Sequence, residues 1–543
     1  MRKIVLSLAC LTLIADSTCA AEVRRADVCI YAATPAGIVA AVTAKQEGLD
    51  VVLVEPSRWV GGILGAGIKP MQDCPEPRAV GGLTKTKVFV AGNDPPSIRR
   101  SFETWLKEEN IPIVFDHRVA KAVKTGGRIT RVELEHSPPD GFGVPPAEGK
   151  PPIVAAIEAK YFIDCSYEGD LMAKAGVSYT YGREPAEKYG EEPAGVGPPT
   201  NWRPIDPYVV PGKPESGLLP LIDVDHGKPR GAGDDYTQAY NFRFYVTDDP
   251  NRRAPITPPA DYDAKKFELV GRYVDYIMQW AGGDVAKATP RLASIFPGWR
   301  NSGEYNYQRN SLVTMAPLGI SRFYQDGDWP TKSRVWREHI DYLRGLHHFL
   351  STDGRVPEAF RKQTAALGLD RTIHPETAGW PNQLYVRISR RMVGPYVLTH
   401  ADVLNRTTVD DSIGLALYGV DTYPARRYAV REPTTGVMGT ATEGNMFIGG
   451  AKGTGKPYAV PYRAITPKAE ECANLLVPVC FSATHIAYAS ARMEPVFCIL
   501  GESAAVATAQ ALRADQTRVQ DINFAKLRGR LLERGQVLQW TTR

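Results

Sequence analysis

After residue 26 the chain has a short apolar run, then a helix pattern, then a second apolar run. Asp27–Tyr31 is a β-rich apolar run, residues 32–37 form a turn of small residues, and Ile38–Glu47 has the alanine and valine content of a buried helix. A second apolar run, Leu49–Val54, ends at the acidic residue Glu55. A strand, a helix and a second strand within about 30 residues make a βαβ unit. The pattern therefore predicts an α/β fold.

The βαβ unit has the spacing of a dinucleotide-binding fold. A pyrophosphate would lie at the positive N-terminus of the helix, and Glu55, 18 residues after Gly37, would accept hydrogen bonds from an adenosine ribose. The G-x-G-x-x-G fingerprint falls on Ala32, Thr34 and Gly37, so only its third position is glycine. Ala32 lacks the freedom of glycine at positive φ. Alone, the unit fits either a nucleotide site or an ordinary βαβ core.

A glycine-rich segment follows Glu55. Residues 61–67 contain four glycines and follow Arg58-Trp59. A segment this rich in glycine can lie flat against a cofactor, and Gly61 and Gly62 are then its contacts. The alternative is a flexible loop.

The rest of the chain shows further elements of both types. Lys121–Val132 has the pattern of a β-hairpin that turns at two glycines, and 474–479 that of a buried strand. Residues 182–214 are dense in proline and glycine and predict a linker or a long excursion. Apolar spacing predicts helices over 265–281, 334–350 and Pro495–Leu512, the last with Gly501 and Glu502 in its first turns.

Residues 1–21 have the three parts of a secretory signal. A basic start precedes an apolar run from Ile4 to Ala15, and small residues lead to a cleavage site near Ala20 or Ala21. The run is shorter than the ~20 residues that span a bilayer. Cleavage would leave a start at about Glu22 and an exported protein, periplasmic or secreted. A buried N-terminal strand or helix, or a lipid-modified cysteine, are the alternatives.

Composition then narrows the class of protein. The chain has 543 residues, which at ~150 residues per domain suggests two to four domains. The net charge is only +5 and no block of five like charges occurs, so a nucleic-acid partner is not expected. Hydrophobic residues make up 43%, which excludes wholesale disorder. No later stretch resembles a membrane span, and without an HExxH motif no metal site is expected.

Six patches in the chain belong together. Residues 31–38 match the turn Y-G-G-T-P-A-G-I except for alanine at both leading glycines, and residues 162–171 are similar to a strand that ends in I-D-A-T-x-x-G-D. The others are residues 54–64, 238–243, 379–392 and 462–505. In this order they resemble the FAD-dependent oxidoreductase family of the glutathione-reductase-like class, which has two dinucleotide folds. The resemblance runs from about residue 27 to 515.

The resemblance implies a fold and a domain plan. It implies an α/β protein whose Rossmann-like FAD-binding domain is discontinuous and carries an inserted mixed α+β substrate domain. After the signal at 1–21, the N-terminal part of the FAD domain would span 22–184, the insert 185–435 and the C-terminal part 436–543.

The resemblance also implies positions for the cofactor. Val119 would lie near the adenine, and Asp164 would either close the dinucleotide site or cap a turn. The helix that carries Gly501 and Glu502 would point its N-terminus at the flavin, or serve as a plain core helix. The cofactor-binding set expected for FAD is therefore Ala32, Ala33, Thr34, Pro35, Ala36, Gly37, Glu55, Gly61, Gly62, Val119, Asp164, Gly501 and Glu502.

Two residues are candidates for chemistry beside the flavin. His485 follows the last predicted strand, where the flavin ring should lie, and a histidine can take a proton as hydride leaves. Arg492 is seven residues on and would share its helix face, where it could hold an anionic substrate or stabilise reduced flavin. A structural hydrogen-bonding role is the alternative for His485. Arg387, Arg390 and Arg391 are candidates for anion recognition or for internal ion pairs.

The expected function is that of an exported FAD-dependent oxidoreductase. It would move a hydride from a small organic substrate, such as an alcohol or a sugar-derived compound, to flavin N5 and pass the electrons to an unidentified acceptor. The alternative is a non-redox exported protein that binds or processes carbohydrate on a flavoprotein scaffold, which the altered turn at Ala32-Ala33 favours. A reductase that uses external NAD(P)H is less expected, because no second intact G-x-G-x-x-G follows.

Overall fold

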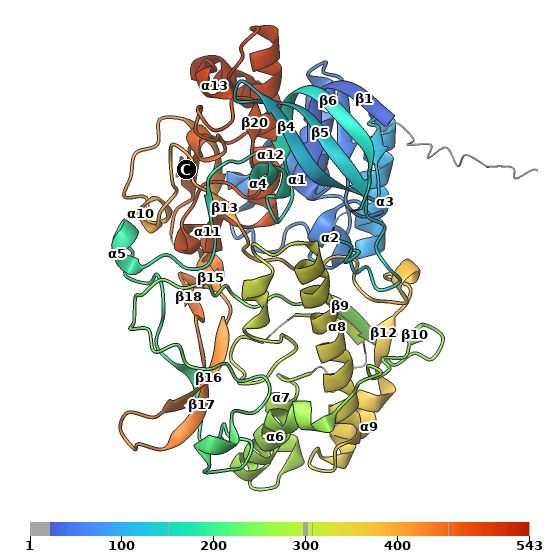
Figure 1. Cartoon of the computed structure of the whole chain (residues 1–543), viewed down its shortest axis with the longest axis vertical. Helices are drawn as coiled ribbons and strands as arrows, with labels where there is room; N and C mark the ends of the chain where they lie inside the picture. The colour runs from blue at the N-terminus through green and yellow to red at the C-terminus, as the bar shows by residue number, and fades with distance from the viewer. Residues whose placement is uncertain (1–21, 150, 297–301, 307, 454, 542–543) are drawn as a thin grey trace, which may run out of the picture.

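The computed structural model describes residues 22–149, 151–296, 302–306, 308–453 and 455–541. The predicted secretory segment therefore lies outside the described residues. In Figure 1 the described chain has a sheet flanked by helices at one end and a larger region of helices, short strands and loops at the other.

A seven-stranded sheet forms the first part. Its order is β3-β2-β1-β6-β5-β4, and β20 pairs with β6. The central strand β1 (Glu22–Tyr31) runs parallel to both β2 (Val51–Val54) and β6 (Ile153–Asp164). Its last residues are buried, which explains their continuous apolar pattern. The other strands are β3 (Ile113–Val114), β4 (His117–Thr125), β5 (Arg128–His136) and β20 (Leu475–Leu476).

The predicted βαβ unit and hairpin are confirmed, with shifted ends. β1 begins at Glu22 instead of Asp27. Helix α1 (Pro35–Gln46) begins three residues before Ile38, because Thr34 caps it and Pro35 suits its first position.

Two apolar helices cover this sheet and pack on each other. α1 contacts β1 and β2, and α12 (Glu494–Arg513) contacts α1 and β6. At their crossing a Cβ on Gly501 would lie 2.5 Å from the carbonyl oxygen of Ala36, so only glycine permits this approach. Within the described residues α12 is the single helix long and apolar enough to cross a membrane, but 89% of its most apolar stretch is buried in the protein. The C-terminal part of the chain thus completes the N-terminal layer, as a discontinuous domain requires.

The middle of the chain forms a mixed α+β region. A four-stranded sheet has the order β10-β12-β9-β11, and β8 joins the hairpin β16-β17. The predicted excursion 182–214 supplies β8 and is therefore anchored to a sheet. The strands are β8 (Thr200–Arg203), β9 (Phe244–Thr247), β10 (Arg253–Ala254), β11 (Ser302–Tyr305), β12 (Gly368–Asp370), β16 (Arg426–Arg431) and β17 (Met438–Glu443).

The remaining helices and three short strand pairs are distributed over both parts. The predicted helices at 265–281 and 334–350 are confirmed as α6 and α8. The helices are α2 (Gly62–Ala66), α3 (Pro95–Glu108), α4 (Asp170–Lys174), α5 (Ala186–Tyr189), α6 (Glu268–Ala281), α7 (Val285–Leu292), α8 (Trp329–Thr352), α9 (Glu358–Ala366), α10 (His400–Val403), α11 (His485–Ala491) and α13 (Phe524–Glu533). The strand pairs are β7 (Tyr179–Thr180) with β13 (Arg391–Met392), β14 (Ser412–Ala416) with β19 (Tyr458–Pro461), and β15 (Val420–Thr422) with β18 (Met446–Ile448).

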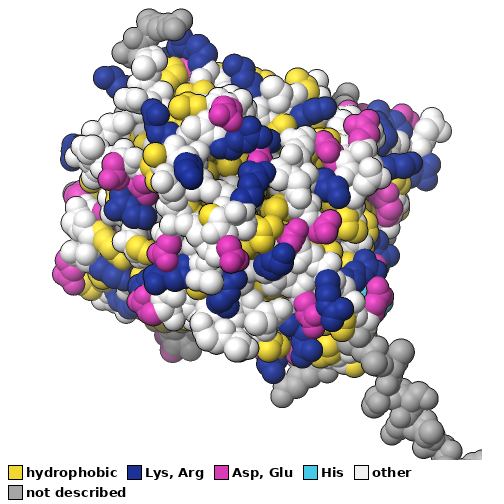
Figure 2. All heavy atoms as spheres, turned by 90° about the horizontal axis from the view of Figure 1, so that it is seen from above, with side chains coloured by type: hydrophobic (Ala, Val, Ile, Leu, Met, Phe, Trp, Pro, Cys, Tyr) yellow, Lys and Arg dark blue, Asp and Glu magenta, His cyan; other side chains and the backbone are white. Residues whose placement is uncertain are grey.

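The surface charges are mixed in sign. On the face shown in Figure 2, basic and acidic side chains alternate with small apolar areas, and the described residues there form no continuous basic stripe.

Candidate active site

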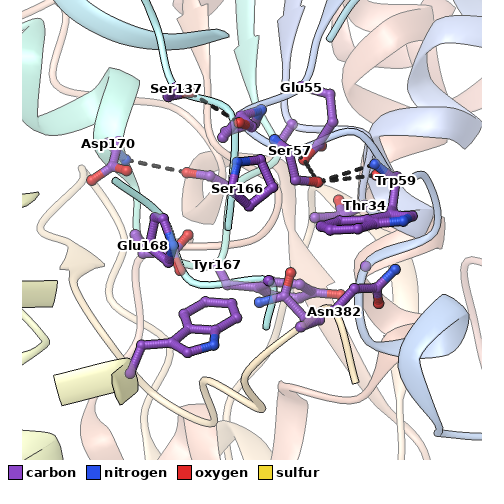
Figure 3. A pocket seen from close by; sticks show the side chains of 18 of the residues that line it. Thr34, Glu55, Ser57, Trp59, Ser137, Ser166, Tyr167, Glu168, Asp170 and Asn382 are labelled. Carbon is purple, nitrogen blue, oxygen red and sulfur yellow. Dashed lines mark hydrogen bonds between the residues drawn. The ribbon is translucent and has the colours of Figure 1, made fainter. Parts of the chain in front are cut away.

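A cleft of about 750 Å³, counting its open mouth, lies where the sheet meets the inserted region. Its walls come from residues 32–62 after β1 and β2, from 137–145, from 166–170 after β6, from 324–336 at the start of α8, and from 382–383. Figure 3 shows how Glu55, Ser57, Thr34 and Asn382 lie around it. The cleft thus lies at the carboxyl ends of parallel strands, where α/β proteins bind their ligands.

The turn before α1 keeps the dinucleotide conformation without its first glycines. Ala32 has φ +75°, a left-handed conformation that costs an alanine roughly 1–2 kcal/mol. At Gly37 a Cβ would lie 1.9 Å from the carbonyl oxygen of Ala32, so this position must be glycine. Thr34 accepts a hydrogen bond from the Gly37 amide at 3.3 Å and donates to the Cys165 carbonyl at 2.8 Å. The strained turn is therefore fixed to β6.

Glu55 closes one end of the cleft. Its carboxylate accepts hydrogen bonds from the Ala33 amide at 2.7 Å and from the amide and hydroxyl of Ser57 at 2.8 and 2.6 Å. Burial raises its pKa, and the bonds from Ser57 and Ala33 oppose that rise. A carboxylate has about four acceptor positions, so Glu55 retains capacity for a ribose hydroxyl.

These features test whether the residues fit the FAD expected from the resemblance. The N-terminus of α1, the close turn at Ala32 and Gly37, and Glu55 at the end of β2 are the three parts of a dinucleotide site. All three face or border the cleft. The residues fit the group.

The other wall of the cleft contains a glycine loop and a buried tyrosine. Gly61 and Gly62 have φ +91° and +45°, and a Cβ on Gly62 would lie 2.6 Å from the hydroxyl of Tyr167. That hydroxyl accepts from the Ile63 amide at 3.2 Å and donates to Glu494 at 2.9 Å. Burial raises the pKa of Glu494 to about 8, although the hydrogen bond from Tyr167 opposes the rise. Glu494 is therefore mostly protonated at neutral pH.

Two further acids lie in the cleft after β6. Burial and the neighbouring Asp170 raise the pKa of Glu168 to about 7, and Tyr324 donates a hydrogen bond to it at 3.0 Å. Burial alone would raise the pKa of Asp170, but Lys332 at 2.7 Å and Arg390 at 3.0 Å bring it below its ordinary value. The two acids thus have opposite protonation tendencies.

Asp164 caps a turn. It accepts from the Ser166 amide and hydroxyl at 3.0 and 2.7 Å and from the Met172 amide at 2.8 Å. Burial raises its pKa to about 6, against the hydrogen bonds from Ser166 and Met172. Ser166 lies on the cleft wall, so Asp164 acts there by positioning Ser166.

Several predicted residues lie away from the cleft wall. Val119 is buried, and its amide donates to the Tyr31 hydroxyl at 3.5 Å. α12 begins at Glu494, so Gly501 and Glu502 lie in its third turn and not in its first turns, which corrects the prediction. Gly501 packs on α1, and Glu502 accepts from the Leu83 amide at 2.9 Å.

His485 and Arg492 also lie outside the cleft wall. Both are buried at the two ends of α11. Neither ring nitrogen of His485 has a hydrogen-bond partner among the described residues. Burial holds the pKa of His485 well below its ordinary value, and Arg391, Arg183 and Arg492 lower it further. His485 is therefore a neutral imidazole among cations, which oppose its protonation.

The aromatic wall and the Tyr167–Glu494 pair were not predicted from the sequence. Trp329, Trp336 and Asn382 reach the cleft from the inserted region, and no local motif marks them. A signal for Glu494 did exist, because it is an isolated acid directly before a long apolar helix.

Known proteins were compared with the chain. The sequence model of the family described as FAD dependent oxidoreductase matches residues 27–531. No curated protein matches. Among solved structures, Thermoplasma acidophilum thioredoxin reductase is similar over 26% of this chain and 35% of its own, with 20% identity and a TM-score of 0.17.

Two further structures show partial similarity. An L-proline dehydrogenase from P. horikoshii is similar over 31% of this chain and 26% of its own, with 20% identity and a TM-score of 0.18. For the 3-ketosteroid dehydrogenase from Rhodococcus jostii the shares are 29% and 50%, with 12% identity and a TM-score of 0.18. This chain thus spans half or less of each of the three structures. The family match covers nearly the whole described chain, and the protein therefore belongs to the FAD dependent oxidoreductase family as an enzyme with FAD as its cofactor.

Proposed function

We propose that this enzyme oxidises a small organic molecule, an alcohol or a sugar-derived compound, by removing a hydride from carbon. The observation that carries the proposal is the composition of the cleft. It joins a dinucleotide site to the aromatic rings of Trp329, Trp336 and Tyr324 and to the carboxyl of Glu168. The indole nitrogen of Trp336 has no hydrogen-bond partner among the described residues. Apolar walls with a few convergent polar groups are typical of small-molecule sites.

The residues that would hold FAD are on the sheet side of the cleft. The Thr34-capped start of α1 would face the pyrophosphate, Glu55 the ribose, and Gly61–Gly62 would allow close approach of the backbone. When bound, FAD supplies the acceptor for the hydride. The protein's own task is to orient the substrate, exclude water and take up the proton that an alcohol loses.

Glu168 is the group best placed to take that proton. It is buried at the cleft wall with a pKa raised to about 7, and a general base works best when its pKa is near the working pH. Tyr324 donates to it, and Asp170, Lys332 and Asp164 are the charged or titratable groups that act on it. His485 lies off the cleft wall among cations, so we assign the proton to Glu168.

The first experiment tests whether the protein binds flavin and whether a substrate reduces it. The purified protein should show an absorbance band near 450 nm that is released by acid precipitation, and a panel of alcohols and sugars should bleach it without oxygen. Bleaching by NADH alone would instead support a reductase. No band after addition of FAD would overturn the proposal. Return of the band with oxygen or with a quinone would identify the class of electron acceptor.

A second experiment tests the base. Glu168→Gln should lower kcat by about 10²–10⁴-fold, the usual contribution of a general base. In the unmodified enzyme kcat/KM should rise with pH through about 7, because only the carboxylate form accepts a proton. This rise should disappear in Glu168→Gln and persist in Glu187→Gln, an exposed control. An unchanged pH profile in Glu168→Gln would reject Glu168 as the base.

We further propose that the protein is exported. The pattern of residues 1–21 supports this, and cleavage near Ala20 or Ala21 would retain the whole described strand β1. Mass spectrometry of the protein from cell fractions should find a mature N-terminus near Glu22 outside the cytoplasm. An intact Met1 in the cytoplasmic fraction would overturn this localisation.

A further inference from the structure

The three neighbouring arginines 387, 390 and 391 have different partners. Arg390 forms ion pairs with Asp326 at 2.8 Å and Asp170 at 3.0 Å, and Arg391 forms one with Glu184 at 2.6 Å. Arg387 instead donates to the Ala239 carbonyl at 3.0 Å and to Asn241 Oδ1 at 2.8 Å, both neutral acceptors. Among the described residues, no carboxylate oxygen lies within 4.0 Å of a side-chain nitrogen of Arg387.

Arg387 is nevertheless buried. Only 3% of the surface of Arg387 is exposed to solvent, and this burial lowers the pKa of its guanidinium. The group stacks on Tyr385 at 4.3 Å and on Tyr423 at 3.7 Å, which provides cation–π attraction but no countercharge. A buried charge without a partner is costly, and such charges are normally paired.

Positive charge is in excess among the groups around Arg387. Arg492 donates to the Tyr385 hydroxyl at 3.0 Å, so both arginines lie around one ring. Arg492 lies 3.4 Å from the Asp421 carboxylate and donates to the Asp421 backbone carbonyl at 3.0 Å, and that carboxylate is in closer contact with Arg309. Arg309 and Arg492 therefore share the Asp421 carboxylate, and Arg387 has no ion pair among the described residues. Asp73 also acts on the charge of Arg492, so two acids face three guanidinium groups.

Two hydrogen-bond donors in this cluster have no partner among the described residues. They are Nε of Arg492 and Nε2 of Gln238, and both atoms are buried. The carbonyl oxygen of the Gln238 side chain lies 3.4 Å from Arg492, so the two residues are neighbours. Unpaired buried donors beside excess positive charge are complementary to a carboxylate, which accepts several charge-assisted hydrogen bonds.

The cluster is linked to the cleft through Glu494 and Tyr167. Arg492 ends α11 two residues before Glu494, the first residue of α12. Glu494 is hydrogen-bonded to Tyr167, which lines the cleft. A molecule in the cleft could therefore extend toward this cluster.

We infer that Arg387, Arg492 and Gln238 bind the carboxylate of an organic acid substrate. The inference rests on the proposed function, since the carbon to be oxidised would lie in the cleft. The donors are shielded from solvent in the structure, so the covering side chains move when the acid enters. The substrate class becomes a hydroxy acid or a sugar acid.

The test uses the FAD-loaded full-length protein and a pair of probes of equal shape. Benzoate carries the carboxylate, and benzamide is its neutral counterpart. Benzoate should raise the melting temperature and change the flavin absorbance with saturation, and bind at least tenfold more tightly than benzamide. Equal effects of the two probes, or no effect of benzoate, would overturn the inference.

Variants locate the binding site. Arg387→Met and Arg492→Lys should each weaken benzoate binding at least tenfold, whereas Arg463→Met, which removes a half-exposed arginine paired with Asp411, should leave it unchanged. Wild-type affinity for benzoate in both cluster variants would refute the assignment. So would a shift of the flavin reduction potential with unchanged benzoate binding, because the cations would then serve the cofactor. If a variant fails to fold, the comparison of benzoate with benzamide in the wild type still decides.

The two proposals can fail separately. Absence of the flavin band would overturn the proposed function, yet melting temperatures with benzoate and benzamide would still report on the anion site. A flavin that alcohols bleach, combined with no preference for benzoate, would overturn only the anion site.

Discussion

Two clusters of buried charge lie near the cleft and differ in their balance. In the first, Asp170 contacts Lys332 and Arg390, and Arg390 also contacts Asp326. In the second, Arg387 and Arg492 lie around Tyr385, and the ion pair in reach is that of Arg492 with Asp421 at 3.4 Å. The first joins the end of β6 to α8 and to the chain before β13. Balanced charge thus connects distant parts of the fold, whereas the unbalanced cluster is suited to a ligand of opposite charge.

Removal of the central acid of the balanced cluster should have the largest effect. Asp170→Asn leaves the buried Lys332 without its carboxylate and should destabilise the protein by about 3–5 kcal/mol, the usual cost of breaking a buried pair. Urea unfolding measures this. Glu338→Gln, which breaks a surface pair with Arg334, is the control and should change little. A loss as small as that of the control would mean that the cluster does not hold the fold.

Glu494 differs from both clusters, because a bound proton and not a neighbouring cation neutralises its buried carboxylate. Its pKa is about 8 in the folded protein against ~4.3 in an unfolded chain. The folded state therefore binds more protons between these values, and stability should fall as pH rises from about 4.5 to 8. The maximal slope for one group is about 1.4 kcal/mol per pH unit. Urea unfolding from pH 5 to 8 should show a shallower dependence in Glu494→Gln, and parallel curves would contradict this.

The turn at Ala32 provides a test of backbone strain at the site. Ala32→Gly removes the cost of φ +75° and should stabilise the protein by about 1 kcal/mol, less the entropy that glycine loses. The melting temperature is the readout. Ala33→Gly, beside it in the same turn, is the matched control and should not stabilise. Destabilisation by Ala32→Gly would show that the turn is not strained.

The smallest loss of stability is expected where the charge is unbalanced. Arg387→Met removes a buried cation without a counterion, so the relief of desolvation offsets the lost hydrogen bonds to Ala239 and Asn241. We expect a change below about 1 kcal/mol in urea unfolding, in contrast to Asp170→Asn. A loss equal to that of Asp170→Asn would remove the distinction between the two clusters.

The sequence predicted what depends on neighbouring residues. The βαβ unit and the acid at Glu55 follow from local spacing, and the structure has them in place, whereas the cap at Thr34 was not predicted. The partners of Arg387, Arg390 and Arg391 could not be predicted, because Asp170 is 220 residues from Arg390 along the chain. The far wall of the cleft at Trp329 and Trp336 is hidden for the same reason. The domain boundaries and the roles of His485 and Arg492 stay predictions.

The return of the C-terminal part to the first sheet has a consequence for folding. β20 pairs with β6, and α12 covers α1 more than 440 residues after α1 has left the ribosome. Contacts between such distant segments slow folding, because the loop between them must close first. Until the last tenth of the chain emerges, the apolar face of α1 has no cover. A chain that crosses a membrane unfolded therefore needs chaperones on the far side to protect α1 until α12 arrives.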